Sequence, residues 1–334
     1  MCQGLALYQE NLGGVWLEVG EKLTEEQFFA LAKPFFTDDR FIKIGHDIKK
    51  DLKTLGASIG EMPKISFDTA IGAYILNPTG SSYEYDDLAK TFLNQVFPSG
   101  EEVLGKGKSK KAFCTLSEEE RKNFAVTQAK VCFEAKKIME KQLAENGQTE
   151  LFYDIEMPLI YVLADMEEYG IKVDKEALLL YQKNLETSID IITKEIFSLS
   201  GEEFNLNSPK QLGVILFEKL GLKGGKKTKT GYSTAADVLE KLKYEHPMVE
   251  KILYYRQLAK LKSTYADGLL AVMDEKTEKI YSTFNQTITA TGRISSTEPN
   301  LQNIPVRLEL GRELRKVFIP ENREFCFLDA DYSQ

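Results

Sequence analysis

The sequence predicts an α/β region followed by a mostly α-helical region and then by the first strands of an α+β region. Residues 1–150 alternate between short β-type runs and helical patterns, whereas residues 151–275 carry apolar side chains at helical spacing. The last fifty residues differ from both, because a polar run punctuated by Gly and Pro leads into a short apolar strand pattern. A chain of 334 residues is long enough for two or three domains. We expect three, at residues 1–150, 151–275 and 276–334.

The first region is expected to interleave strands and helices. The predicted elements are a hairpin (residues 4–8 and 15–19), a buried strand (41–45) that leads into a helix, a helix from Asp68 stopped by Asn77 and Pro78, a Gly- and Lys-rich surface loop (100–111) and a long helix (117–143). Three glutamates follow Ser117, and the helix dipole favours acidic residues in a first turn.

The second region is expected to be a set of helices joined by short loops. The predicted helices run from Asp154 to Tyr169, from the cap Asp174 to about Ser200, from a capping box at Ser208 and Gln211, and from Pro247 onward. Between the last two lies a basic, Gly-rich stretch at residues 223–231. On the final helix, Arg256 and Lys260 are four residues apart and therefore share a face.

Charge is distributed unevenly along the chain. The formal net charge is −8, yet residues 222–262 carry ten Lys/Arg against four Asp/Glu. Such asymmetry indicates one basic surface on an otherwise acidic molecule, as nucleic-acid binding requires. For any single cluster, the alternative is a charged face that is only solvated.

Composition excludes several other classes of protein. A hydrophobic content of 43% and a charged content of 28% are ordinary for a globular protein with sizeable cores. The four cysteines (Cys2, Cys114, Cys132 and Cys326) show no CxxC spacing, which favours free thiols in a reducing compartment. The two histidines, His46 and His246, are too far apart in sequence to suggest a zinc site or a catalytic triad. No apolar run approaches the roughly 20 residues of a membrane span, and no signal peptide is evident, so we expect a cytoplasmic protein without a membrane partner.

The polar run near the end of the chain suggests contact with DNA. Its candidate donors are Arg293, Asn300, Gln302 and Asn303. The DNA minor groove presents acceptors at every base pair, so these side chains suit a protein that must bind any sequence. A polar loop that satisfies its own backbone explains the same Ser, Thr and Asn content equally well.

The apolar run 325–328 ends in two carboxylates, Asp329 and Asp331, which would share a face of a strand. Carboxylates beside a rigid strand end suit a divalent cation, because Mg²⁺ is held by one or two carboxylates together with substrate phosphates. The alternative is a pair of strand-end charges that point into water.

Together these motifs resemble family A DNA polymerases of the DNA polymerase I type. TATGRISSTEPNLQNIPVR (289–307) is similar to the family's entry into the palm domain, which contacts the primer-template, and DYSQ (331–334) is similar to the start of its motif A. The resemblance implies that Asp331, rather than Asp329, is the catalytic ligand of two metal ions. NLNSPKQLG (205–213), GYSTAADVLEKL (231–242) and YYRQLAKLKSTYADGL (254–269) resemble the family's thumb, which implies that Arg256 and Lys260 contact duplex DNA and that the Lys-rich loop is the mobile thumb tip.

The first region resembles the family's 3′–5′ exonuclease domain, with an RNase H-like fold. IGHDIKKD (44–51), FDT (67–69) and YILN (74–77) carry the likeness, and Asp51 matches one metal-binding acid. The strand with the family's Asp-x-Glu is expected to be missing. FAVTQ (124–128) stands where the family has Tyr-x-x-x-Asp, so Gln128 replaces an acid. Because a neutral amide is a poor substitute for a charged ligand of a hard cation, we interpret this domain as a degenerate exonuclease.

The resemblance therefore implies template-directed DNA synthesis with two Mg²⁺ ions, in replication or repair, by a monomer whose partners are primer-template DNA and deoxynucleoside triphosphates. It also implies that the chain stops within motif A, before the fingers and the second carboxylates of the palm. Residues 1–334 alone are then expected to bind primer-template without extending it. The alternatives are a non-catalytic duplex-binding module and an active 3′–5′ exonuclease, which Gln128 argues against.

Overall fold

The chain forms two compact units, each of which includes a segment distant in sequence. The computed structural model describes residues 4–60, 62–223, 227–228, 231–305 and 309–332. Unit 1 comprises Met1–Tyr169 and Thr283–Thr297, and unit 2 comprises Gly170–Ser282 and Glu298–Gln334. Residues 283–297 thus group with the first region of the chain, an arrangement that the three consecutive predicted domains do not contain.

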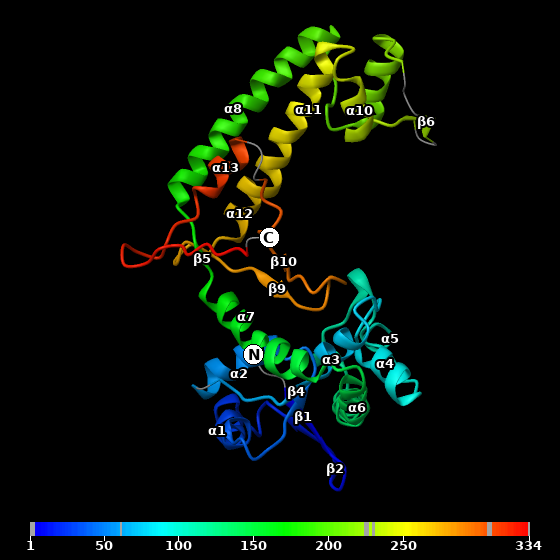
Figure 1. The fold of residues 1–334 in the computed structure, drawn as a ribbon, viewed down its shortest axis with the longest axis vertical. Helices are drawn as coiled ribbons and strands as arrows, with labels where there is room; N and C mark the ends of the chain where they lie inside the picture. Colours follow the sequence, from blue (N-terminus) through cyan, green and yellow to red (C-terminus); the bar gives the residue numbers. More distant parts are fainter. Residues whose placement is uncertain (1–3, 61, 224–226, 229–230, 306–308, 333–334) are drawn as a thin grey trace. The chain divides into compact units, whose positions relative to one another are not determined.

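Unit 1 mixes helices with two-stranded pairings (Figure 1). Its elements are β1 (Gly4–Gln9), β2 (Gly13–Glu18), α1 (Glu25–Thr37), β3 (Ile44–Gly45), α2 (Lys49–Ile59), β4 (Phe67–Asp68), α3 (Thr69–Leu76), α4 (Tyr85–Leu88), η1 (Ala89–Leu93), α5 (Gly100–Leu104), η2 (Gly107–Ser109), η3 (Phe113–Thr115), α6 (Glu118–Glu145), η4 (Leu151–Glu156), α7 (Met157–Tyr169), β9 (Thr283–Asn285) and β10 (Ser295–Thr297). β1 and β2 form the predicted antiparallel hairpin, and β3 pairs in parallel with β4.

The helices of unit 1 begin at the residues that their caps predict. Ser117 caps α6 through a reciprocal capping box with Glu120, and Asp68 caps α3, which ends at Asn77. The loop predicted at residues 100–111 is partly helical, because Ser99 and Glu102 form a further capping box that starts α5. This box was not recognised in the sequence.

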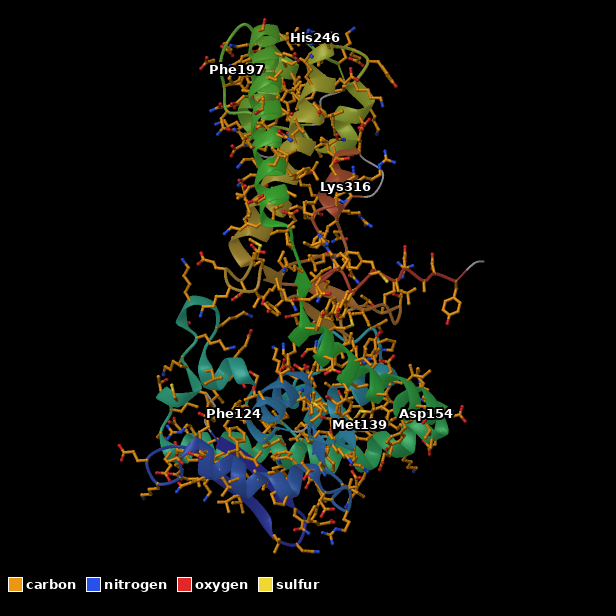
Figure 2. All side chains as sticks on the ribbon, turned by 90° about the vertical axis from the view of Figure 1, so that its left-hand side faces the viewer. Phe124, Met139, Asp154, Phe197, His246 and Lys316 are labelled. Atoms are coloured by element: carbon orange, nitrogen blue, oxygen red, sulfur yellow. The ribbon has the colours of Figure 1, made fainter. Side chains whose placement is uncertain are left out.

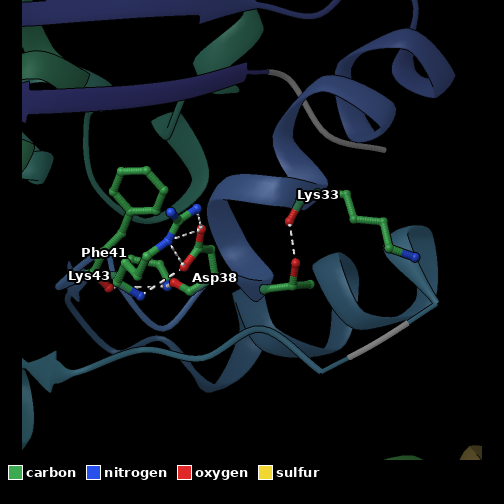
Figure 3. Close-up of polar contacts among 6 residues, drawn as sticks. Lys33, Asp38, Phe41 and Lys43 are labelled. Carbon is green, nitrogen blue, oxygen red and sulfur yellow. Dashed lines mark hydrogen bonds and ion pairs between the residues drawn. The ribbon is translucent and has the colours of Figure 1, made fainter.

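The strand predicted at residues 41–45 is shorter than expected, because only Ile44 and Gly45 pair with a neighbour. In the residues before them, the Lys43 side chain bonds back to the preceding backbone (Figure 3). The Lys43 amine donates to the carbonyl oxygens of Asp38, at 2.7 Å, and Phe41, at 3.2 Å. Phe41 is 48% exposed, so the apolar pattern did not signal burial here.

Unit 1 has two apolar cores. The larger one is built mainly from α3, α6, η4 and α7, around side chains such as Phe67, Met139 and Phe152. The smaller one gathers Phe28, Phe29, Phe36 and Ile59 between α1 and α2. These cores stabilise the helices that carry the polar groups described below.

Unit 2 is organised around two long helices. Its elements are β5 (Ile171–Lys172), α8 (Lys175–Ser200), α9 (Pro209–Gly213), η5 (Val214–Lys219), β6 (Lys227–Thr228), β7 (Gly231–Tyr232), α10 (Ala236–Leu242), α11 (Pro247–Lys260), η6 (Leu261–Ala266), α12 (Asp267–Val272), β8 (Lys279–Ile280) and α13 (Glu309–Arg315). α8 and α11 pack side by side, and Phe197, near the end of α8, lies beside His246, at the start of α11 (Figures 1 and 2). The two helices are therefore antiparallel and enclose one core, in which Leu185, Ile196 and Ile252 are buried.

Two predictions for unit 2 need correction. Ser208 caps α9 as expected, but the Gln211 side chain accepts from the Asn205 amide, at 2.7 Å, rather than closing a capping box. The apolar run 325–328 forms no strand, and Phe325, Phe327 and Leu328 are exposed. A strand must pair its backbone groups, and no described residue pairs with this run. Within the described ranges, no helix is both long and apolar enough to cross a bilayer.

Candidate nucleic-acid and metal sites

The polar segment predicted to contact DNA begins in unit 1, at the hairpin of β9 and β10. Ser295 pairs with Asn285 and Thr297 with Thr283. The connecting loop turns at Gly292, whose φ of +76° suits glycine, and the Thr289 hydroxyl donates to the Arg293 carbonyl at 2.5 Å. The Arg293 side chain is exposed next to this turn, where a nucleic-acid strand could reach it.

Side chains of four residues in unit 1 hold this hairpin segment in place. The Lys49 amine donates to the Phe284 carbonyl and to Glu167, and Glu167 in turn accepts from the Phe284 amide at 2.8 Å. The Tyr74 hydroxyl donates to the Thr289 carbonyl at 2.7 Å. The Gln286 amide nitrogen donates to the Glu156 carboxylate at 2.8 Å and to its carbonyl at 3.1 Å.

The remainder of the polar segment lies in unit 2. Asn300 uses its side-chain oxygen to accept from the amides of Gln302 and Asn303, both at 3.1 Å. Part of the loop therefore does satisfy its own backbone, as the alternative interpretation expected. The Tyr265 hydroxyl donates to the Asn303 carbonyl, which ties the loop to the helix that continues from Arg256 and Lys260. Asn300, Gln302 and Asn303 are all exposed.

The basic residues of unit 2 are less available than their number suggests. Lys243, Lys251 and Lys262 form ion pairs with Glu240, Glu195 and Glu186, respectively. The guanidinium of Arg256 donates to the carbonyl and the hydroxyl of buried Thr234, and its pKa is lowered by burial.

Lys260, in contrast, is exposed. The Lys-rich stretch proposed as the thumb tip lies largely outside the described residues.

Asp329 and Asp331 lie in an exposed stretch without regular secondary structure, at the end of the described residues. The neighbouring Tyr332 is 99% exposed. Both carboxylates are open to solvent, and their hard oxygen atoms are the ligands that Mg²⁺ prefers. Geometry alone does not separate the two acids.

Asp51 lies in the first turn of α2, close to two other acids. Burial of the carboxyl group, followed by the negative charges of Asp47 and Asp68, raises the pKa of Asp51 to about 6, although the residue as a whole is exposed. Asp68 has a structural task, because its buried carboxylate accepts from the amides of Asp47, Ile48, Ala70 and Ile71. Among the residues that the structure describes, no three His, Cys, Asp or Glu side chains are grouped to hold a metal ion.

Gln128, the residue in place of an acid, lines a different cavity of about 420 Å³ together with Tyr85 and Phe124. Asp51 is not part of that lining. Lys49, Tyr74 and Glu167 were not predicted from the sequence to be site residues. Their partners are more than a hundred residues away, so no local pattern signals the contacts.

Two family models match the chain. The model of the 3′–5′ exonuclease family matches residues 6–144, and that of DNA polymerase family A matches residues 175–334. Among curated proteins, DNA polymerase I of Bacillus subtilis is 43% identical over 90% of the chain and 34% of its own length. DNA polymerase I of Geobacillus stearothermophilus is 40% identical over 99% of the chain and 37% of its own length. The chain thus spans about a third of these relatives.

A solved structure shares the fold. It is the POL domain of Pol1 from M. smegmatis in complex with DNA primer-template and dNTP, with a TM-score of 0.79 and 33% sequence identity, covering 95% of this chain and 52% of that one. The two family matches divide the chain into an exonuclease-type part followed by a polymerase-type part. The chain belongs to DNA polymerase family A.

Proposed function

We propose that this chain serves template-directed DNA synthesis, in DNA replication and repair. The observation that carries the proposal is the match to DNA polymerase family A over residues 175–334, a range that includes every unit 2 residue assigned to DNA or metal binding. The structural neighbour from M. smegmatis, bound to primer-template and dNTP, supports the same partners for this chain.

Asp331 is the proposed catalytic ligand for two Mg²⁺ ions. Its carboxyl group is exposed, and its hard oxygen atoms suit a hard cation. When bound, the ions would lower the barrier of nucleotidyl transfer by neutralising charge on the attacking and leaving oxygen atoms. Asp331 would contribute a negative charge that both ions share, and the segment 298–305 would orient the duplex.

The proposed duplex contacts combine direct donors with charge. Arg293, Asn300, Gln302 and Asn303 would donate to minor-groove acceptors, which every base pair presents, so that any template is accepted. Lys260 and Arg256 would neutralise phosphates. Arg256 also holds Thr234, and therefore has a second, structural function.

The first region is proposed to be an RNase H-like exonuclease fold without nuclease activity. Gln128 supplies no charge where the family has an acid, and the described residues offer no metal-binding group near Asp51. We further propose that residues 151–275 act as the thumb and residues 276–334 as the entry to the palm, in a monomeric cytoplasmic enzyme.

The test is primer extension by a chimera that joins residues 1–334 to the rest of the catalytic domain of the Bacillus subtilis relative. The parent chimera should extend a primer in the presence of Mg²⁺. Asp331→Ala should abolish extension, because the ions lose a shared ligand, whereas Asp329→Ala should retain most of it.

Both variants should bind primer-template within about twofold of the parent, which separates loss of metal from loss of folding. Equal losses at Asp329 and Asp331 would refute the metal assignment. Binding without extension in the parent would favour a non-catalytic duplex-binding module.

A further inference from the structure

The exonuclease-like fold and the hairpin segment Thr283–Thr297 form one compact unit, although more than a hundred residues separate them in sequence. Exonuclease activity, which this region is proposed to lack, does not account for its contacts with a segment assigned to DNA binding. The contacts between them are specific, mostly buried and directed at the backbone of the hairpin segment.

The first contact is a buried ion pair that brackets one residue of β9. The side chains of Lys49 and Glu167 are only 10% and 6% exposed. Lys49 donates to the carbonyl of Phe284 and Glu167 accepts from its amide, so both backbone groups of one residue are held. A buried charge pair contributes little net stability compared with apolar residues of the same size, but it fixes geometry when its hydrogen bonds are directional.

The second contact lies at the loop itself. Tyr74 is 4% exposed, and its hydroxyl donates to the Thr289 carbonyl at 2.7 Å. The Thr289 hydroxyl in turn donates to the Arg293 carbonyl, at 2.5 Å. Tyr74 is therefore linked, through hydrogen bonds of Thr289, to the backbone of Arg293, the arginine assigned to DNA binding.

We propose that Lys49, Glu167 and Tyr74 are positioning residues for primer-template binding, which hold the hairpin segment so that Arg293 is presented in one conformation. Unit 1, which contains the exonuclease-like region, then contributes to DNA binding without any nuclease step. Ordering the loop in advance reduces the entropy lost when DNA binds, and affinity rises accordingly. This inference rests on the proposed function.

Tyr74→Phe is the sharpest variant, because it removes one hydroxyl and leaves the ring in the core. The matched control is Tyr83→Phe. Tyr83 packs edge-on against Tyr74, with ring centroids 6.0 Å apart, and its hydroxyl also donates to a carbonyl at 2.7 Å, but that carbonyl belongs to Asn77. Tyr74→Phe should raise the dissociation constant for primer-template about three- to tenfold, and Tyr83→Phe by less than about twofold.

Two further variants separate positioning from stability. Lys49→Met should destabilise unit 1, because buried Glu167 loses its closest cation and keeps the more distant Lys53, at 3.6 Å. Lys49→Met combined with Glu167→Leu removes both charges and should restore the melting temperature while DNA affinity stays low. Recovery of affinity together with stability would overturn the proposal.

Hydrogen exchange in the free protein tests the positioning without DNA. Amides in residues 284–297 should exchange faster in Tyr74→Phe and in the double variant than in the parent or in Tyr83→Phe. Unchanged exchange overturns the proposal even if Tyr74→Phe weakens DNA binding. If the parent binds no primer-template, the proposed function fails, and the DNA part of this inference fails with it.

A double-mutant cycle links the anchor to the arginine. In an Arg293→Ala background, Tyr74→Phe should have little further effect on affinity, because the group that it positions is absent. Fully additive losses would show that Tyr74 acts through something other than Arg293.

Discussion

The imidazole of His46 packs among side chains of unit 1. The ring stacks on Tyr85, with centroids 4.3 Å apart, and Nδ1 lies 3.0 Å from the Thr69 hydroxyl. Burial lowers the pKa of His46 to about 4, since a charged ring would lose hydration there. The folded protein therefore keeps this ring neutral over a pH range in which an unfolded chain would protonate it.

This difference predicts a pH-dependent stability. Below its ordinary pKa of 6.5, His46 binds a proton in the unfolded chain, whereas in the folded chain its pKa is about 4. The free energy of unfolding should therefore decrease as the pH drops from 6.5 to about 4. The loss that His46 causes should be at most about 3 kcal/mol. Urea unfolding of the parent and of His46→Gln between pH 7.5 and 4.5 measures it. The parent should lose more stability than the variant, and parallel curves would contradict the assignment.

At the residue scale, the sequence identified Asp51, Gln128 and Asp331 through their motifs, and the structure adds their surroundings. The sequence could not reveal that the Arg256 guanidinium donates hydrogen bonds to Thr234. Nor could it reveal that the Asp68 carboxylate accepts hydrogen bonds from four backbone amides. Both facts depend on chain segments brought together by folding. A side chain's type is visible in the sequence, but its partners are not.

At the scale of elements, α11 carries the clearest test of DNA binding. Duplex affinity should fall with salt, with a log–log slope of about −0.9 for each neutralised phosphate. Lys260→Ala should flatten that slope by about one unit, since its exposed amine is available to a phosphate. Adding Arg256→Ala should flatten it further and also lower the melting temperature, because Thr234 loses its partner.

The matched control lies on the same helix. Lys251 is paired with Glu195 at 2.5 Å, so Lys251→Ala should leave the salt slope unchanged. Affinities measured by anisotropy between 50 and 200 mM salt decide the question. If Lys260→Ala behaves like Lys251→Ala, the basic cluster is only solvated.

Helices were predicted well from the sequence, and strands poorly. α3, α6, α8 and α11 begin at caps that are local in sequence, namely Asp68, Ser117, Asp174 and the turn before Pro247. A strand, in contrast, depends on a partner. The run at 325–328 is apolar enough for a strand, yet no described residue pairs with it, and the strand at 41–45 is limited to the two residues that β4 can pair.

At the scale of the whole molecule, the chain should show no 3′–5′ exonuclease activity. Gln128 is neutral, and a neutral amide is a poor substitute for a charged ligand of a hard cation. Labelled single-stranded DNA incubated with the protein and Mg²⁺ or Mn²⁺ should keep its length. A polymerase with an intact exonuclease, run in parallel, shows that the substrate can be digested. Shortening that disappears in Asp51→Ala would establish an active nuclease.

The division of the molecule was the hardest feature to predict. Composition and periodicity change near residues 150 and 275, and three consecutive domains followed from those changes. The structure groups residues 283–297 with residues 1–169, through contacts at Lys49, Tyr74 and Glu156. Sequence patterns depend on residues that are close along the chain. They therefore do not show that a late segment packs against residues much earlier in the sequence.

The returning segment also affects how the chain folds. Unit 1 is incomplete until residue 297 has been synthesised, and closing a loop of roughly a hundred disordered residues would cost about 4 kcal/mol of chain entropy. Unit 2 shortens that loop, because Ile171 of β5 pairs with Ile280 of β8 and so brings its own two ends together. Once β5 has paired with β8, the path from α7 to β9 through this pairing contains only a few residues, so the loop that remains to be closed is short. Folding on the ribosome should therefore proceed from the middle of the chain outward, with the hairpin segment docking last.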